Sequence, residues 1–200
     1  MKLLTLKEIE DLHKKYAPTD EVFELVFTHC QIVWDVASQL IDAQTLDIDS
    51  DLIKAGCLLH DIGVYELYDE NGIEREKEQY ITHGVRGEAI LKAEGFPEII
   101  SRFASHHTGF GLTKEDIRVL HVALPSHNYS AETTEEKLIM YADKFHSKVG
   151  RVCFNSFGWA KTSVKKFGNQ KTAIFQELAD EFGVPDLLVL MHKYGHELRN

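Results

Sequence analysis

The sequence predicts an all-α protein, because apolar residues recur at helical spacing along nearly the whole chain. Helix-start and helix-stop residues bound these patterns at intervals, and no run of alternating apolar and polar residues predicts a strand. The clearest pattern lies in residues 20–41, where one helix face carries Val22, Leu25, Val26, His29, Val33 and Val36. The length of 200 residues suits one domain with its own core.

Boundary signals place the helices in chain order. Thr5 is positioned to cap the first helix, and Gly63 follows the third helix where a helix stop is needed. Pro97, a favoured first-turn residue, opens the fifth. Thr133, with Glu136 three positions later, forms a capping-box pattern ahead of another helix. The predicted helices cover residues 5–16, 20–41, 51–60, 82–94, 97–107, a short segment from 113, 133–143, 170–182 and 185–197.

The remaining segments indicate how the chain is organised. Residues 124–133 are rich in turn-forming residues and are predicted to be a loop. Beyond residue 147 the chain becomes basic and aromatic before its last two helices begin. We therefore predict one domain over residues 1–147, with its core at about 20–147. Residues 148–200 are predicted to be a C-terminal helical appendage packed on the same domain.

Composition and charge exclude several functional classes. The net charge of −10 argues against a nucleic-acid partner, because backbone binding depends on clustered Lys and Arg. No stretch is long and apolar enough to span a bilayer, and no signal peptide is visible, so no membrane partner is expected. The three scattered cysteines favour reduced thiols and a cytoplasmic location, and the apolar surroundings of Cys30 and Cys57 predict that these two are buried.

The eleven histidines are the compositional feature that points to chemistry. Several histidine and acidic side chains fall at helix ends or on an apolar helix face, where an ionisable group is costly unless it is paired or bound to metal. Their positions on five separate elements favour a shared metal site. The residues are His29, the pair His60 and Asp61, His83, the pair His106 and His107, and Asp143.

Other histidines fit no such series. His192 and His196 are four positions apart and could clamp a metal, but their charged neighbours favour a solvent-facing helix. The rest of this group comprises His13, His121, His127 and His146.

The ordered motifs resemble the HD superfamily of metal-dependent phosphohydrolases over about residues 20–147. The resemblance is carried by His29, by GCLLHDIG with His60 and Asp61, and by YADK with Asp143. The segments HGVRGEAIL, with His83, and HHTGFGLT, with His107, resemble the subset that holds two metals. That subset includes HD-type hydrolases of symmetrical diadenosine tetraphosphate. The implied fold is an HD-domain helical bundle.

The resemblance implies a ligand set. The ligands of the first metal would be His29, His60, Asp61 and Asp143. Asp61 would bridge to a second metal bound by His83 and by either His106 or His107. His107 is favoured because it directly precedes the Thr-Gly dipeptide. Imidazole and carboxylate ligands without sulfur suit two divalent transition metals, and ligand type does not choose among iron, manganese, zinc and cobalt. Iron or manganese is the expectation, with zinc or cobalt as alternatives.

The implied function is hydrolysis of a phosphoester or phosphoanhydride bond in a small, nucleotide-like substrate by metal-activated water. His60 and Asp61 would be catalytic, and substrate phosphates would contact Lys144, Arg86 and Thr108. Val64 stands where many HD proteins carry a lysine after HDIG. An HD-type di-iron oxygenase and a metal-stabilised regulatory or binding module without turnover are the alternatives, and a homodimer is left open.

Overall fold

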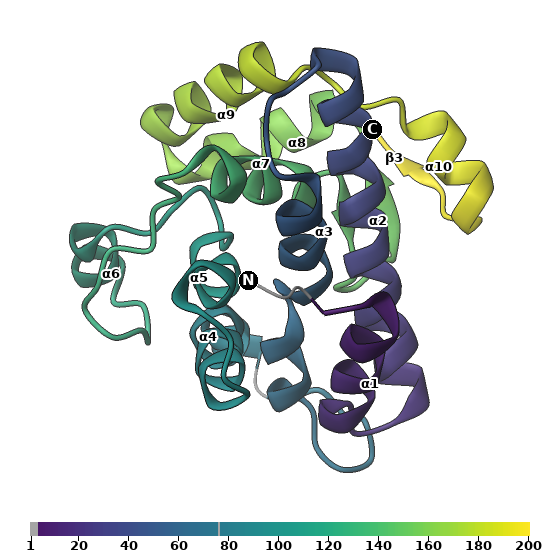
Figure 1. Ribbon diagram of the computed structural model, residues 1–200. Coiled ribbons are helices and arrows are strands. Elements are labelled where there is room, and N and C mark those ends of the chain that lie inside the picture. The colour runs from purple at the N-terminus through teal and green to yellow at the C-terminus, as the bar shows by residue number, and fades with distance from the viewer. Residues whose placement is uncertain (1–3, 76) are drawn as a thin grey trace.

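The computed structural model describes residues 4–75 and 77–200, and this part of the chain is predominantly helical (Figure 1). The α-helices are α1 (Leu6–Tyr16), α2 (Asp20–Gln44), α3 (Ser50–Leu59), α4 (His83–Ala93), α5 (Glu98–His106), α6 (Lys114–Leu120), α7 (Thr134–Asp143), α8 (Phe157–Val164), α9 (Asn169–Phe182) and α10 (Leu187–Tyr194). The 3₁₀ helices are η1 (Ile62–Leu67), η2 (Lys77–Thr82) and η3 (Lys165–Phe167). Three short strands, β1 (His146–Ser147), β2 (Cys153–Asn155) and β3 (Leu198–Arg199), form one sheet. The predicted all-α class is confirmed.

Side-chain caps fix where several helices begin. The Thr133 hydroxyl accepts a hydrogen bond from the Glu136 backbone N–H at 3.2 Å, and the Glu136 carboxylate accepts one from the Thr133 N–H. Thr5 and Glu8 form the same reciprocal pair at α1. Each arrangement satisfies backbone donors that the first helical turn leaves without partners. The capping signals therefore predicted these two starts correctly.

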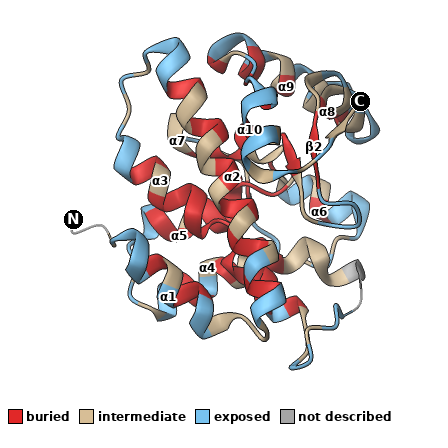
Figure 2. Ribbon diagram, turned by 90° about the vertical axis from the view of Figure 1, so that its right-hand side faces the viewer, coloured by how far each residue is buried: buried red, intermediate tan, exposed pale blue. Residues whose placement is uncertain are grey.

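The long helix α2 lies at the centre of the core. Val26 and Val33 are fully buried on its inner face, and His29 lies between them. α2 packs against α3 and α7, while α5 packs against α3 and α4. Buried residues accordingly concentrate on α2, α3 and α5 in Figure 2. This packing brings the ends of several helices to the inner face of α2.

Some predicted details were wrong. Gly63 does not stop α3; it lies within η1, where a β-carbon would come within 2.1 Å of the His83 carbonyl oxygen. The final helix covers only Leu187–Tyr194, and α8 was not predicted. The small sheet was also missed, because strands of two or three residues show no periodicity. In it β1 is antiparallel to β2, and β2 is parallel to β3.

Two expectations about the environment of the chain can be compared with the structure. Cys30 and Cys57 are buried free thiols, as the sequence predicted, and Cys153 is buried and free as well. Burial raises the pKa of Cys30 and Cys57, which keeps both as thiols. In the described residues, no helix has the length and apolarity needed to cross a membrane.

Candidate metal centre

Six histidine and aspartate side chains converge beside α2. His29 extends from the middle of α2, whereas the other five stand at element ends. These are His60 and Asp61 after α3, His83 at the start of α4, His107 after α5, and Asp143 at the end of α7. Helix ends let side chains approach one point from different directions, which successive residues inside one helix cannot do.

The first cluster comprises His29, His60, Asp61 and Asp143. The Nε2 atom of His29 lies 3.0 Å from Asp143 Oδ1 and 3.1 Å from Asp61 Oδ2. His60 Nε2 lies 3.1 Å from the same Asp61 oxygen. Metal–ligand bonds of about 2.1 Å place neighbouring donor atoms roughly 3.0–3.4 Å apart. These separations therefore fit four donors around one cation.

The second cluster comprises Asp61, His83 and His107. Asp61 Oδ1 lies 3.5 Å from His83 Nε2 and 3.5 Å from His107 Nε2. The two Nε2 atoms are 3.0 Å apart. Because Asp61 presents Oδ2 to the first cluster and Oδ1 to this one, its carboxylate stands between two potential ion sites.

Backbone contacts determine which ring nitrogen of three histidines is free. His60 Nδ1 donates to the Cys57 carbonyl at 2.7 Å, and His83 Nδ1 donates to the Tyr80 carbonyl at 2.6 Å. His107 Nδ1 donates to the Phe103 carbonyl at 3.1 Å. A carbonyl only accepts, so each neutral ring directs an Nε2 lone pair into the clusters. Among the described residues, no hydrogen bond satisfies His60 Nε2 or Asp61 Oδ1 despite full burial, while Asp61 Oδ2 contacts the Lys148 ammonium.

The profile of the HD domain family matches residues 26–148, which include all six side chains. The chain belongs to the HD domain family. Two solved structures show the same fold for the HD domain. They are the HD domain of the L. monocytogenes phosphodiesterase PgpH and its complex with cyclic-di-AMP. The first has 18% identity, a TM-score of 0.54, and coverage of 94% of this chain and 99% of that one. The second has 17% identity, a TM-score of 0.54, and coverage of 96% and 100%.

Curated relatives share part of the HD-domain chain. A tRNA (cytidine(56)-2'-O)-methyltransferase of Picrophilus torridus is 36% identical over 62% of this chain and 32% of its own length. An uncharacterised protein of Methanocaldococcus jannaschii is 36% identical over 60% of this chain and 65% of its own length. A methyltransferase of the same name from Thermoplasma volcanium is 33% identical over 66% and 34%. The matches thus span less than two thirds of each of these relatives.

Ionisable side chains of opposite charge shift one another's pKa values inside the candidate metal centre. Burial would raise the pKa of Asp61, but the opposing charges of His60 and Lys148 hold it well below its usual value. Burial would lower the pKa of His60, but the charge of Asp61, together with the contacts of His60 to Cys30 and Asp143, outweighs burial and holds that pKa well above its usual value. A proton therefore competes with a metal cation for His60 Nε2.

Lys148 and His146 are functional candidates that the sequence analysis missed. The buried Lys148 ammonium contacts Asp61 Oδ2 directly, and its side chain is only 7% exposed. The buried His146 ring contacts His29, with 2.9 Å between their Nδ1 atoms. Both residues follow α7 within five positions of Asp143. That closeness was the available signal, but a turn after a helix does not predict the direction of its side chains.

The predicted phosphate-binding residues differ in their surroundings. Lys144 lies beside the clusters, with its Nζ 2.7 Å from Asp143 Oδ2 and 3.3 Å from the His107 carbonyl oxygen. The Thr108 hydroxyl is buried without a hydrogen-bond partner among the described residues. Arg86 instead contacts Glu66, Thr82 and Gln79, none of which belongs to either cluster.

His106 and His107 are separated by the end of α5. His106 Nδ1 lies 2.7 Å from the Ser105 hydroxyl, and its Nε2 atom belongs to neither cluster. His107 enters the second cluster. The geometry therefore favours the same member of the pair as the Thr-Gly dipeptide.

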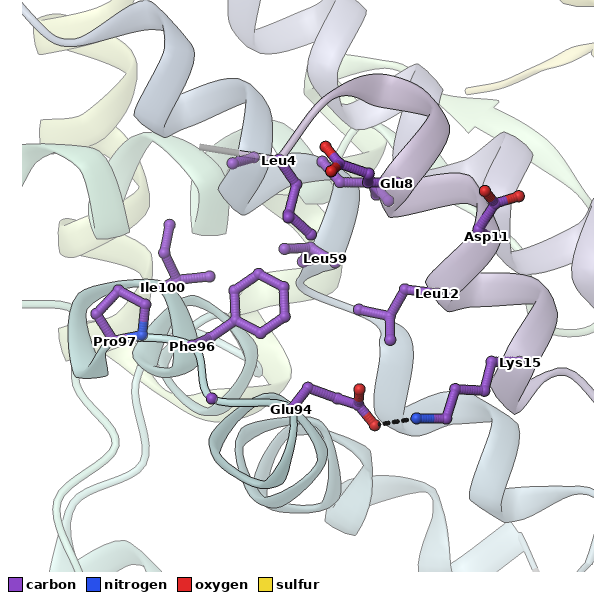
Figure 3. Close-up of a pocket in the computed structure, with 13 residues that line it drawn as sticks. Leu4, Glu8, Asp11, Leu12, Lys15, Leu59, Glu94, Phe96, Pro97 and Ile100 are labelled. Atoms are coloured by element: carbon purple, nitrogen blue, oxygen red, sulfur yellow. Dashed lines mark hydrogen bonds and ion pairs between the residues drawn. The ribbon is translucent and has the colours of Figure 1, made fainter. Parts of the chain in front are cut away.

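A separate apolar cavity of about 500 Å³ lies between α1 and the turn that joins α4 to α5 (Figure 3). Leu12, Leu59 and Phe96 form part of its wall, and Lys15 pairs with Glu94 at 2.6 Å on its rim. Among the described residues that line it, none belongs to the two His/Asp clusters. The cavity is thus distinct from the candidate metal centre.

Proposed function

We propose that the chain is a metal-dependent phosphohydrolase that cleaves a phosphoester or phosphoanhydride bond of a nucleotide-like substrate. The observation that carries this proposal is the buried Asp61 carboxylate, whose two oxygens face two clusters of imidazole lone pairs. Lys148 pairs with Oδ2, but among the described residues Oδ1 and His60 Nε2 are buried without hydrogen-bond partners, which is costly, and metal cations would satisfy them. Membership of the HD domain family supports the same proposal.

The first ion would be held by His29, His60, Asp61 and Asp143, and the second by Asp61, His83 and His107. Two ions per chain are therefore proposed, and the ligand set suits iron, manganese, zinc or cobalt, of which we propose iron or manganese. When bound, divalent ions would polarise a phosphoryl oxygen and lower the pKa of a water molecule towards neutrality. His60 and Asp61 would act by holding this centre, which is the catalytic role we propose for them.

The chain's own cations would bind and orient the substrate. Lys144 and Lys148 place two ammonium groups beside the clusters, where they would contact phosphate oxygens. The Thr108 hydroxyl has a free donor and would add a hydrogen bond. Arg86 would support the site only indirectly, because its guanidinium contacts Glu66, Thr82 and Gln79 rather than a residue of either cluster. The PgpH HD domain binds cyclic-di-AMP in its solved complex, which supports a nucleotide-like ligand here.

The alternative of a di-iron oxygenase uses the same ligand set. Val64 is buried and apolar, so it supplies no cation of the kind expected after HDIG. Lys148, however, places a lysine ammonium at Asp61 from another part of the chain. The choice between the two reactions therefore rests on oxygen dependence. A metal-stabilised module without turnover would bind ions and cleave nothing.

The first test combines metal analysis with a substrate panel. Wild-type protein resupplied with manganese is expected to hold two ions and His83→Ala one, while Asp61→Ala loses both. Manganese-loaded protein should release phosphate, or cleave a pyrophosphate bond, from nucleotides or dinucleotides under strict anaerobiosis. His60→Ala and Asp61→Ala should abolish that release, whereas the exposed His192→Ala should not. Turnover that requires both iron and oxygen would contradict the hydrolytic proposal.

A further inference from the structure

A chain of three imidazoles leads from the first cluster to the C-terminal segment. His29 and His146 lie 2.9 Å apart through their Nδ1 atoms, and His146 Nε2 lies 3.0 Å from His196 Nδ1. The planes of the His146 and His196 rings differ by 19°, which suits a hydrogen bond in the ring plane. His146 is buried and His196 is half-buried. The first cluster is therefore connected to a residue more than one hundred positions from most of its donors.

We propose that His196 is a positioning residue of the metal centre: it holds His146, which in turn holds His29 in the orientation and tautomer that the first ion requires. This inference rests on the metal-binding function proposed above. Residue 196 lies outside the matched residues 26–148, so membership of the HD family does not account for it.

The hydrogen-bond roles follow from the first cluster outwards. His29 directs Nε2 at Asp61 and Asp143, so as a neutral metal ligand it carries its proton on Nδ1. His146 must then accept at Nδ1 and carry its own proton on Nε2. His196 Nδ1 then accepts a hydrogen bond from His146 Nε2–H, which completes the chain. Without His196, His146 could move its proton to Nδ1, where it would oppose the N–H of His29.

The small sheet holds His196 in place. β3 pairs with β2, and the Phe154 backbone N–H donates to the Glu197 carbonyl at 2.8 Å. The Arg199 side chain donates to Asn155 Oδ1 at 3.0 Å through Nε, and its guanidinium lies 3.7 Å from the centre of the Trp159 ring. Figure 1 shows β3 and α10 beside α2, and α10 packs against α2. The position of His196 is therefore determined by contacts on both sides of it in the chain.

The experiment measures manganese affinity in a protein with one remaining site. His83→Ala is used as the background because it removes the second cluster, and competition with a chelator gives the affinity of the first. Losing the direct partner of a metal-bound histidine costs about 10–100-fold in affinity. We expect such a loss for His146→Ala and roughly a tenfold loss for His196→Ala. The control is His192→Ala, which should not change the affinity, because His192 is an exposed histidine of α10, the helix that precedes His196.

The conservative variant His196→Gln separates positioning from general destabilisation. Its side-chain carbonyl can accept from His146 Nε2–H, so it should restore most of the lost affinity. The absorption spectrum of cobalt-loaded protein should change in His196→Ala and recover in His196→Gln. Equal affinities for His196→Ala and the His83→Ala background, or failure of His196→Gln to restore binding, would overturn the inference alone. Absence of metal from the wild-type protein would instead overturn the proposed function.

Discussion

At the scale of single residues, the histidines differ in what their second ring nitrogen contacts. His13 Nε2 donates to the Leu58 carbonyl at 2.7 Å, and its Nδ1 accepts from the Tyr65 hydroxyl at 2.8 Å. Both nitrogens of this buried ring are therefore used within the core. His60 has one backbone partner at Nδ1 and directs Nε2 at Asp61 in the first cluster, which is the arrangement expected of a metal ligand.

His13 should make stability depend on pH. Burial lowers its pKa to about 4, whereas the unfolded chain has the ordinary value of 6.5. As pH falls below 6.5, His13 becomes protonated in the unfolded state, whereas in the folded state it stays neutral until about pH 4. The contribution of neutral His13 to the free energy of unfolding is therefore fully present above pH 6.5. Between pH 6.5 and pH 4 the protein loses about 3 kcal/mol of this contribution.

Urea unfolding at pH 7 and pH 4.5, in the presence of chelator, measures this effect. His13→Gln retains an amide donor and a carbonyl acceptor but cannot take up the proton, so it should lose less stability over that interval. His127→Gln, at an exposed position, serves as the matched control and should behave like the wild type. Identical pH dependence in His13→Gln and the wild type would show that His13 contributes nothing.

Sequence reasoning found the six His and Asp residues of the candidate site because they lie in recognisable local motifs, five near helix ends and His29 on the apolar face of α2. It did not reach His146, Lys148 or His196. Their roles depend on how the turn after α7 and the C-terminal strand meet the inner face of α2. Those contacts arise only from tertiary packing, which spacing along one segment does not specify.

At the scale of elements, the approach of η1 to α4 positions the second cluster. A β-carbon on Gly63 would lie 2.1 Å from the His83 carbonyl oxygen and 2.2 Å from the Gly87 nitrogen. Both neighbours are backbone atoms, so a side-chain rotation cannot relieve the contact. The two elements could accommodate a larger residue only by moving apart, which would displace His83 from Asp61.

We therefore expect Gly63→Ala to lower the free energy of unfolding by at least about 3 kcal/mol. It should also reduce metal content towards one ion per chain. Gly158→Ala is the control, because Gly158 lies in α8 with no atom within 4 Å of an added β-carbon. That substitution should be neutral or slightly stabilising. Urea unfolding and metal analysis of both variants give the comparison, and unchanged stability in Gly63→Ala would contradict the packing argument.

The helices were predictable for a reason that does not extend to the strands. α2 and α7 carry long apolar patterns and capping residues, both of which are local signals. Strand β3 exists because Leu198 pairs with Phe154, and such pairing over a long sequence distance leaves no mark in a segment of two residues. Gly63 shows the same limit: its position was noticed, but its role in packing was not.

At the scale of the whole molecule, the net negative charge disfavours a nucleic-acid ligand, whereas the metal clusters favour a small phosphorylated one. The chain carries 32 acidic and 22 basic residues. We expect no retention of tRNA in filter binding at about 150 mM salt, because backbone phosphates would meet net repulsion. The matched segments cover about a third of each of the two tRNA methyltransferase relatives. The experiment therefore tests whether the segment that this chain shares with them binds tRNA.

The same filter-binding experiment includes a small-ligand arm. A dinucleotide should bind the manganese-loaded protein, since its few phosphates would contact the metal clusters and meet less of the net repulsion that acts on a long backbone. Asp61→Ala should lose that binding. Saturable tRNA binding with micromolar or tighter affinity would contradict the charge argument and favour a role on RNA.

The sequence separation of the donors has a consequence for how long the protein persists. His29 and Asp143 are 114 positions apart, whereas His83 and His107 are 24 apart. An ion in the first cluster would act as a reversible cross-link that closes most of the chain into a loop, and opening α2 away from α7 would require its release. Withdrawal of metal would therefore expose the chain to proteases, as limited proteolysis with and without chelator would register. The lifetime of the protein would then follow the supply of metal.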